Sequence, residues 1–199
     1  TGEAHLVEEA VKHYLLEYAE LLLFLLVAMT YVNAITERGI FDALRVWLIG
    51  KGFNYRALFW LTGFCAFFLS PVLDNLTTAL VLCAVLLAVG KDNPQFISLG
   101  AINIVVAANA GGAFSPFGDI TTLMVWQKGL VEFWTFFALF LPSLVNFIVP
   151  AFCMSFAIST EIPPTTKEQS PLKRGAWIVL GLFICTIVLA VSFHSFLHL

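Results

Sequence analysis

Two short segments of the chain each place one carboxylate among apolar residues. SPVLDNLTT (residues 70–78) and SPFGDITT (residues 115–122) both contain Ser-Pro, two further residues, an Asp and then a Thr pair. Asp74 and Asp119 are the only charged residues in the long apolar stretches around them. An ionised Asp at the bilayer centre costs about 2.5–3.5 kcal/mol on insertion scales, so a carboxylate there usually has a function. Cation binding, proton exchange and acid–base catalysis are all open to such a pair.

Neutral oxygen donors surround both carboxylates. Taken singly, each of these side chains is as well explained by packing between helices. Together with the carboxylates and the free carbonyls of broken helices, they form a set of hard ligands that suits a small cation. The donors are Ser70, Asn75, Thr77 and Thr78 around the first carboxylate, and Asn109, Thr121 and Thr122 around the second.

The charge of these segments favours a cation over an anion. Neither segment contains Lys or Arg, so an anion would depend on helix N-termini alone, against two carboxylates. Burial and a neighbouring carboxylate both favour the protonated form of a carboxyl group, so protons could compete with a cation for the same oxygens. The sequence therefore predicts a Na⁺ and proton site at Asp74 and Asp119, with no bound cofactor.

Two other interpretations of the acidic segments are available. Both Asp residues could cap the helices that follow them, since Asp is a favoured N-cap. Ser caps comparably without a charge, and Ser70 and Ser115 lie nearby, so capping alone does not explain the carboxylates. Two buried aspartates also serve in intramembrane aspartyl proteases. The Thr pairs suit cation coordination and are unnecessary for peptide hydrolysis.

The composition sets the class of protein that must position these groups. Of the 199 residues, 60% are hydrophobic and 12% are charged, which is too few charges to cover a soluble domain. The mean hydropathy is +0.92. The sequence therefore predicts an all-α polytopic membrane protein whose partners are the lipid bilayer and a small cation, with no nucleic acid.

The lengths of the apolar stretches predict the topology. A spanning helix needs about 20 residues. Residues 57–90 are too many for one crossing and too few for two, and Pro71 interrupts them, which predicts a re-entrant helical hairpin. The expected elements are an N-terminal helix with the first scaffold span (1–36), a cytoplasmic amphipathic interfacial helix (37–56), the hairpin (57–90), a discontinuous transmembrane helix (93–129), a scaffold span (132–160), a cytoplasmic loop (161–174) and a further span (175–199).

The distribution of basic residues favours this topology over one with two hairpins. The topology with one hairpin places eight of the ten Lys and Arg residues on one side of the membrane and two on the other. A second hairpin would place six on one side and four on the other. The positive-inside rule therefore places the more basic side in the cytoplasm. The basic residues on that side are Arg38, Arg45, Lys51, Arg56, Lys91, Lys167, Lys173 and Arg174, and those on the other are Lys12 and Lys128.

Three longer motifs resemble the NhaD-type sodium/proton antiporters of the ion transporter superfamily. They are AFFLSPVLDNLTTAL, INIVVAANAGGAFSPFGDITTLMVWQKG and FFALFLPSLVNFIVPA, and the resemblance extends over about residues 17–157. It implies a secondary transporter, not an enzyme, that exchanges Na⁺ or Li⁺ for H⁺ across the bacterial inner membrane. It also implies homodimers and an elevator-like motion of a hairpin-bearing domain against a scaffold.

The resemblance also implies which polar residues matter. Two family-like positions, His13 and Glu20, lie on the first helix with Glu17 between them, and a His beside carboxylates could sense alkaline pH. The solvated end of a helix is an equally good interpretation of these three residues. The positions implied for the ion site are Ser70, Asp74, Asn75, Thr77, Asn109, Asp119, Thr121 and Thr122.

Transporters of this class contain two inverted repeats, with their sites where the repeats meet. One hairpin and one broken helix make one repeat, so we expect the chain to be a fragment of a protein about twice as long. The rival within the superfamily is a sodium-coupled carboxylate, sulfate or arsenite carrier, in which these segments would bind the coupling ion. The missing half could supply the basic residue that such a carrier needs.

Overall fold

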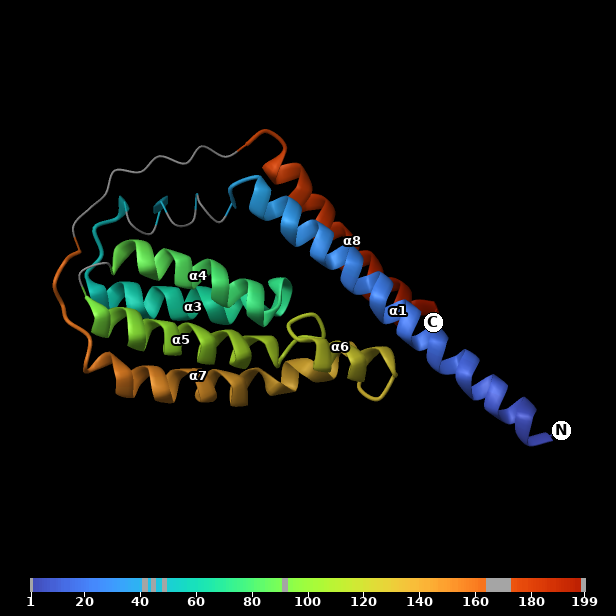
Figure 1. Cartoon of the computed structure of the whole chain (residues 1–199). Coiled ribbons are helices and arrows are strands. Elements are labelled where there is room, and N and C mark those ends of the chain that lie inside the picture. Colours follow the sequence, from blue (N-terminus) through green and yellow to red (C-terminus); the bar gives the residue numbers. More distant parts are fainter. Residues whose placement is uncertain are drawn as a thin grey trace. The chain divides into compact units, whose positions relative to one another are not determined.

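The computed structural model describes residues 2–40, 43, 46, 47, 50–90, 93–163 and 173–197. Within these residues the chain is helical and contains no strand. The chain divides into two compact units, one formed by residues 1–38 with 173–199 and the other by residues 39–172 (Figure 1). Each unit is described by itself.

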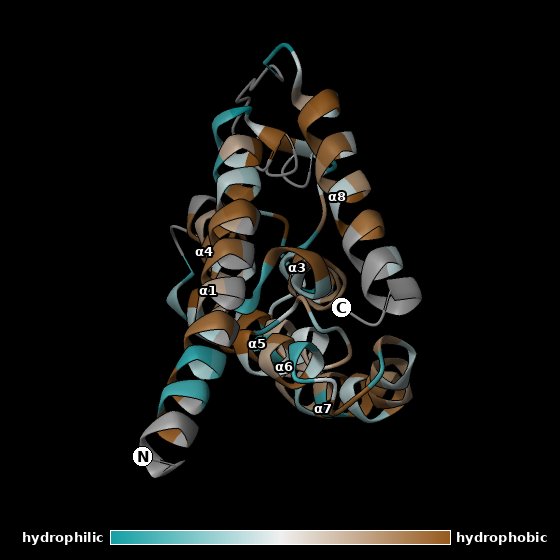
Figure 2. Ribbon diagram, turned by 90° about the vertical axis from the view of Figure 1, so that its right-hand side faces the viewer, coloured by the Kyte–Doolittle hydropathy of each residue, from teal (hydrophilic) through white to brown (hydrophobic). Residues whose placement is uncertain are grey.

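The first unit pairs the two ends of the chain. Helix α1 (Gly2–Glu37) is unbroken over 36 residues and packs against α8 (Ala176–Leu197). The Arg38 guanidinium donates to the Arg174 carbonyl where α1 ends and α8 begins. Figure 2 shows apolar residues along α8 and more hydrophilic ones on the N-terminal part of α1.

Aromatic and hydroxyl groups join α1 and α8 further along. The ring of Tyr31 lies 5.4 Å from that of Phe183. The Thr186 hydroxyl is hydrogen-bonded to the Tyr31 hydroxyl at 3.1 Å. The hydroxyl of the half-buried Tyr31 thus has a hydrogen-bond partner within this interface.

The second unit is a layer of helices that carries both acidic segments. In Figure 1, α4, α3, α5 and α7 are drawn one below another; α3 packs against each of the other three, and α5 also packs against both α4 and α7. Its elements are α3 (Tyr55–Leu73), α4 (Asn75–Val89), α5 (Pro94–Gly112), α6 (Ile120–Gln127), the 3-10 helix η1 (Phe133–Leu139) and α7 (Phe140–Ser155).

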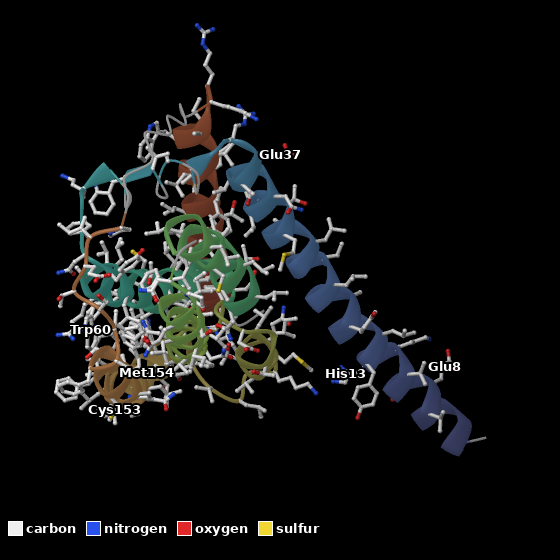
Figure 3. The ribbon with its side chains drawn as sticks, turned by 60° about the vertical axis from the view of Figure 1, so that its left-hand side comes forward. Glu8, His13, Glu37, Trp60, Cys153 and Met154 are labelled. Carbon is white, nitrogen blue, oxygen red and sulfur yellow. The ribbon has the colours of Figure 1, made fainter. Side chains whose placement is uncertain are left out.

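Aromatic rings form the core of this layer. Phe67 of α3 is fully buried, and its ring lies 5.3 Å from Phe114 and 5.5 Å from Phe147. Gly63 lets α7 approach α3, because a Cβ at this position would come within 3.0 Å of the Phe147 ring. Trp60 of α3 and Met154 of α7, labelled in Figure 3, pack against the same core.

Hydrogen bonds between neighbouring segments fix how the helices of the layer are aligned along one another. The Asn103 amide of α5 is fully buried and donates to the Phe59 carbonyl of α3 at 2.9 Å. The Tyr55 N–H donates to the Glu161 carbonyl at 2.9 Å, and so ties the start of α3 to the chain just after α7. Arg56 strengthens this link, since its guanidinium donates to the Ile158 carbonyl at 3.0 Å.

Three helical segments of the described part are long and apolar enough to cross a membrane. They are Tyr55–Leu73, Pro94–Gly112 and Phe133–Ser155, the last formed by η1 and α7 together. Asn75–Leu87 and Ala176–Leu189 are shorter apolar helices. The all-helical, membrane-spanning class predicted from the sequence is thus confirmed at this level.

The break in the first acidic segment lies later than the sequence indicated. We expected Ser70-Pro71 to interrupt the helix, but α3 continues through Pro71 and ends at Leu73. Pro71 has no N–H for the Phe67 carbonyl, the acceptor one turn earlier. That carbonyl lies against Gly111 of α5, where a Cβ would come within 2.1 Å of it. The Phe67 carbonyl that Pro71 leaves without its helical donor thus lies at the close contact between α3 and α5, and the chain turns only at Asp74.

Two predicted elements fall partly outside the described residues. In the interfacial helix expected at 37–56, the described positions 43, 46, 47 and 50 are helical. Of the loop expected at 161–174, the structure describes only residues 161–163 and 173–174.

Candidate functional site

Both helix breaks lie at the same end of the helix layer, where Figure 1 draws the α3–α4 turn beside the α5–α6 connection. Two hydrogen bonds join them. The Ser115 hydroxyl donates to the Pro71 carbonyl at 2.8 Å. The Asn75 amide nitrogen donates to the Asp119 carboxylate at 2.7 Å. The two acidic segments, distant in sequence, therefore form one polar cluster.

Asp74 forms the turn between α3 and α4 in a strained backbone conformation. Its φ of 69° and ψ of 157° make it the only non-glycine residue with positive φ in the described part of the chain. Only Gly commonly adopts this region, and strain of this kind costs about 1–3 kcal/mol. Thr77 holds the turn, since its N–H donates to one Asp74 oxygen at 2.9 Å and its hydroxyl to the other at 2.8 Å.

Asp119 begins α6 with an extended backbone, at a φ of −149°. One carboxylate oxygen accepts from the N–H and the hydroxyl of Thr121, both at 2.9 Å. The other oxygen faces the hairpin and accepts from Asn75. The Thr122 hydroxyl donates to the Asp119 backbone carbonyl at 2.8 Å. Both aspartates are thus N-caps, as the capping interpretation requires, but Asp119 needs only one oxygen for that role.

Asn75 is the centre of the cluster. Its Oδ1 accepts from the Ser70 hydroxyl at 2.5 Å, and its Nδ2 also lies 3.4 Å from the Asn109 Oδ1. Asn109 is held in turn by α5, because its Nδ2 donates to the Val105 carbonyl at 2.8 Å. One side chain therefore contacts α3, α5 and the residue that begins α6.

Glycines allow the breaks to approach this closely. A Cβ at Gly112 would lie 2.1 Å from the Asn75 Oδ1 and 2.9 Å from the Gly118 carbonyl. A Cβ at Gly118 would lie 2.4 Å from the Gly112 Cα. The glycines of NAGGAFSPFGD thus serve as points of contact between backbones as well as helix breakers.

The cluster is open on one side and buried on the other. Asp74, Asn75 and Asp119 are half-buried, and Asn109 and Thr121 are exposed. Ser70 and Thr78 are buried, and the Thr78 hydroxyl has no hydrogen-bond partner within the described residues. All nine side chains predicted for the ion site thus lie on the two breaks or the helix turns beside them.

The metal-binding capacity of the cluster depends on neutral oxygens. No three His, Cys, Asp or Glu side chains of the described part form a group that could hold a metal ion. An alkali cation does not need such a group, since it accepts carbonyl, amide and hydroxyl oxygens alongside one carboxylate. The donor set is therefore compatible with a weakly held monovalent cation.

The three residues considered for pH sensing lie on the other unit. His13 is exposed on the N-terminal part of α1 (Figure 3), and its ring lies 5.9 Å from that of Tyr14. The side chains of Glu17 and Glu20 lie outside the described residues. Their role stays a prediction.

Sequence reasoning missed two contributors to the cluster. Ser115 was considered only as an alternative cap, yet its hydroxyl links the breaks through the Pro71 carbonyl. Gly112 entered only as part of the discontinuous helix predicted over residues 93–129, yet its backbone lies against the Asn75 amide. The shared Ser-Pro pairs were the available signal, but a sequence does not show which hydroxyl reaches which carbonyl.

Comparison with known proteins identifies the family. The family model described as CitMHS, citrate transporter, matches residues 7–199. The chain is 59% identical over its whole length to the Na⁺/H⁺ antiporter NhaD of Vibrio cholerae, of which it covers 42%. It is 62% identical to NhaD of Vibrio parahaemolyticus, with 95% of the chain and 46% of that protein aligned.

A plant relative is more distant. Sodium/proton antiporter 2 of Arabidopsis thaliana is 36% identical, over 78% of the chain and 38% of that protein. No solved structure is significantly similar. The chain thus spans less than half the length of the bacterial relatives it matches. The resemblance to NhaD-type antiporters is confirmed, and the chain belongs to the CitMHS, or citrate transporter, family.

Proposed function

We propose that the chain forms one half of a secondary transporter that exchanges Na⁺ or Li⁺ for H⁺. The observation that carries this proposal is the Asp119 carboxylate, one oxygen of which points away from its own helix and meets the hairpin at Asn75. The names of the bacterial relatives support the same exchange.

The proposed exchange relies on competition for this carboxylate. Na⁺ binds when Asp119 is ionised and neighbouring oxygens such as that of Asn109 complete its coordination. Protonation removes the charge that holds the cation, so a proton taken from the other side of the membrane releases it. Asp74 is the second ionisable group, and Thr77 holds its oxygens at the tip of the hairpin.

We propose that α3 and α4 form a re-entrant hairpin and that α5 and α6 form one broken spanning helix. Helix α4, which follows the turn, has 15 residues, or about 22 Å at a rise of about 1.5 Å per residue, and is too short to cross a bilayer core of about 30 Å. Helix α6 lies beyond the level at which α3 turns back, and α7 returns to the end where α3 begins (Figure 1). That end carries Lys51 and Arg56, so the positive-inside rule makes it cytoplasmic.

We further propose that α3 to α7 move as one body in an elevator-like cycle. The sequence predicts residues 132–160 as a scaffold span. Helix α7, which lies within these residues, is in the same compact unit as the hairpin, and Phe147 packs against Gly63 in the core of that unit. This packing supports joint movement of α7 with the hairpin, while α1 and α8 would form the scaffold. Homodimers and a bacterial inner-membrane location complete the proposal.

The family description favours a second candidate, a carrier of citrate or another carboxylate. Such a substrate needs positive charge nearby. None of the described side chains that hydrogen-bond to either break is a Lys or an Arg. The protease alternative has less support, since Thr77, Thr121 and Asn75 hold the two carboxylates separately.

Reconstituting the full-length protein in liposomes tests the proposal. Proton flux should follow gradients of Na⁺ and Li⁺ but not K⁺, and Asp119→Asn should abolish it. Glu161→Gln, which removes an exposed carboxylate outside the cluster, is the matched control and should retain flux. Unchanged flux in Asp119→Asn, or citrate uptake without proton exchange, would overturn the proposal.

A further inference from the structure

We infer that the side-chain amide of Asn75 reverses when the cation binds, so that its oxygen becomes a ligand. This inference rests on the proposed function, because it assigns Na⁺ to the Asp119 side of the cluster. In the structure the amide nitrogen faces two oxygens, the Asp119 Oδ2 at 2.7 Å and the Asn109 Oδ1 at 3.4 Å. A reversed amide would instead turn its own oxygen toward these two.

The neighbours on that side cannot change orientation freely. The Asn109 amide nitrogen donates to the Val105 carbonyl in its own helix, so its oxygen stays directed at Asn75. Asp119 is held by Thr121, which donates twice to the other carboxylate oxygen. The oxygens of Asn109 and Asp119 are therefore two fixed acceptors that face the Asn75 amide. The orientation of that amide decides whether an N–H group or a third oxygen is directed at them.

Ser70, on the opposite side of Asn75, can form a hydrogen bond with either orientation of the amide. Ser70 is buried, and its hydroxyl now donates to the Asn75 Oδ1 at 2.5 Å. A hydroxyl can also accept a hydrogen bond. After reversal, the Asn75 nitrogen would donate to Ser70, so neither orientation loses its partner on this side.

Packing against Gly112 limits the motion of the Asn75 side chain on one side. The Gly112 backbone lies so close to the amide that a Cβ there would come within 2.1 Å of the Asn75 Oδ1. The side chain therefore has little room to swing away on that side. A half-turn about its last bond exchanges an oxygen for an NH₂ group of similar size and needs little additional space.

The cation decides between the two orientations. In the empty site a reversed amide would bring three acceptor oxygens together, which repel one another, so the amide donates to Asp119 instead. With Na⁺ bound, those oxygens become ligands and the amide N–H would repel the cation. The hairpin tip and the broken helix thus stay linked in both states, by a hydrogen bond when empty and by the cation when filled.

The direct test observes the amide in the full-length protein. Asparagine is isotope-labelled, the protein is placed in lipid nanodiscs, and side-chain amide resonances are followed by NMR as NaCl replaces choline chloride. The Asn75 resonance, assigned through Asn75→Asp, should shift with the Na⁺ binding curve. The Asn93 amide, whose oxygen caps α5 by accepting from the Phe96 N–H, is the internal control and should not shift.

One substitution should change the Na⁺ affinity in opposite directions for the two possible roles of Asn75. Asn75→Leu preserves size but neither donates nor accepts. If the amide becomes a ligand, the variant should bind Na⁺ about tenfold more weakly, the size expected for one contact to a charge. If the amide only donates to Asp119, it competes with the cation, and its loss should tighten binding. Na⁺-dependent thermal stabilisation measures the difference, with the sodium-free melting temperature as the check on folding.

The outcomes separate this inference from the proposed function. A wild-type protein that exchanges Na⁺ while the Asn75 resonance stays unchanged, or whose Asn75→Leu variant binds Na⁺ more tightly, overturns the inference alone. A wild-type protein with neither Na⁺-dependent flux nor stabilisation overturns the proposed function. An amide shift together with weaker binding in the variant supports both.

Discussion

Ser115 of the second break donates its hydroxyl to the carbonyl oxygen of Pro71 in the first, at 2.8 Å. The chain ends α3 two residues after Pro71, so this carbonyl has no donor from a following helical turn. The second break therefore supplies the hydrogen-bond donor, the Ser115 hydroxyl, that the Pro71 carbonyl at the end of α3 does not find within its own helix.

Ser115→Ala should destabilise the protein by about 1–3 kcal/mol, the cost of leaving a buried acceptor without its donor. The melting temperature of the full-length protein, read from tryptophan fluorescence, measures this. Ser98→Ala, on the exposed face of α5, is the control and should change stability by less than about 0.5 kcal/mol. Equal effects of the two substitutions would show that the Pro71 contact contributes no stability.

The strained backbone of Asp74 predicts that Gly is better tolerated there than Ala. Both substitutions remove the carboxylate, so both should abolish exchange under the proposed function. Asp74→Gly relieves the positive φ and should be about 1–3 kcal/mol more stable than Asp74→Ala.

Asp119 provides the matched control for this comparison, because it caps a helix with an ordinary φ of −149°. Asp119→Gly and Asp119→Ala should differ by less than about 1 kcal/mol, the usual range of N-cap effects. Denaturant unfolding of the four variants gives both differences. If the Gly variant were more stable than the Ala variant by the same amount at both positions, the backbone of Asp74 would not be strained.

Gly111→Ala should disrupt the layer, because the new Cβ would lie 2.1 Å from the Phe67 carbonyl, a backbone atom that cannot move aside. We expect a loss of more than about 2 kcal/mol. Gly181→Ala in α8, where no atom lies within 4 Å of the new Cβ, should stabilise its helix by about 0.5–1 kcal/mol. Destabilisation of similar size at both positions would contradict the close approach of α3 and α5.

Protons should weaken Na⁺ binding competitively if Asp119 carries both. Lowering the pH adds protons to the carboxylate and removes the charge that attracts the cation, so the apparent Kd for Na⁺ should rise as the pH falls. Asp119→Asn should bind Na⁺ weakly at every pH and lose this dependence. Na⁺ titrations of the full-length protein across a pH series measure both. A pH dependence that persists in the variant would place the competing proton elsewhere.

Apolar length and helix-end chemistry determined much of the secondary structure in advance. Long uncharged stretches predicted the helical, membrane-spanning class because backbone groups in lipid must bond within their own helix. Asp residues followed by Thr pairs marked the starts of α4 and α6, since an Asp cap bonds to N–H groups only two or three residues away. Such local interactions depend on neighbouring residues alone.

The tertiary structure decided which polar groups meet. In the sequence Ser70, Asn75 and Ser115 are possible hydrogen-bond donors and Asp119 a possible acceptor, and nothing in their spacing assigns the Ser115 hydroxyl to Pro71 or the Asn75 amide to Asp119. Those pairings require α3 and α5 to pack at one particular register, which the Phe67–Gly111 contact permits. The position of the first turn, at Asp74 beyond Pro71, was likewise not specified by the Ser-Pro pair. Long-range packing selects among the hydrogen bonds that local sequence leaves open, so the sequence predicted the nine side chains proposed for the ion site but neither the part played by Ser115 and Gly112 nor the connections.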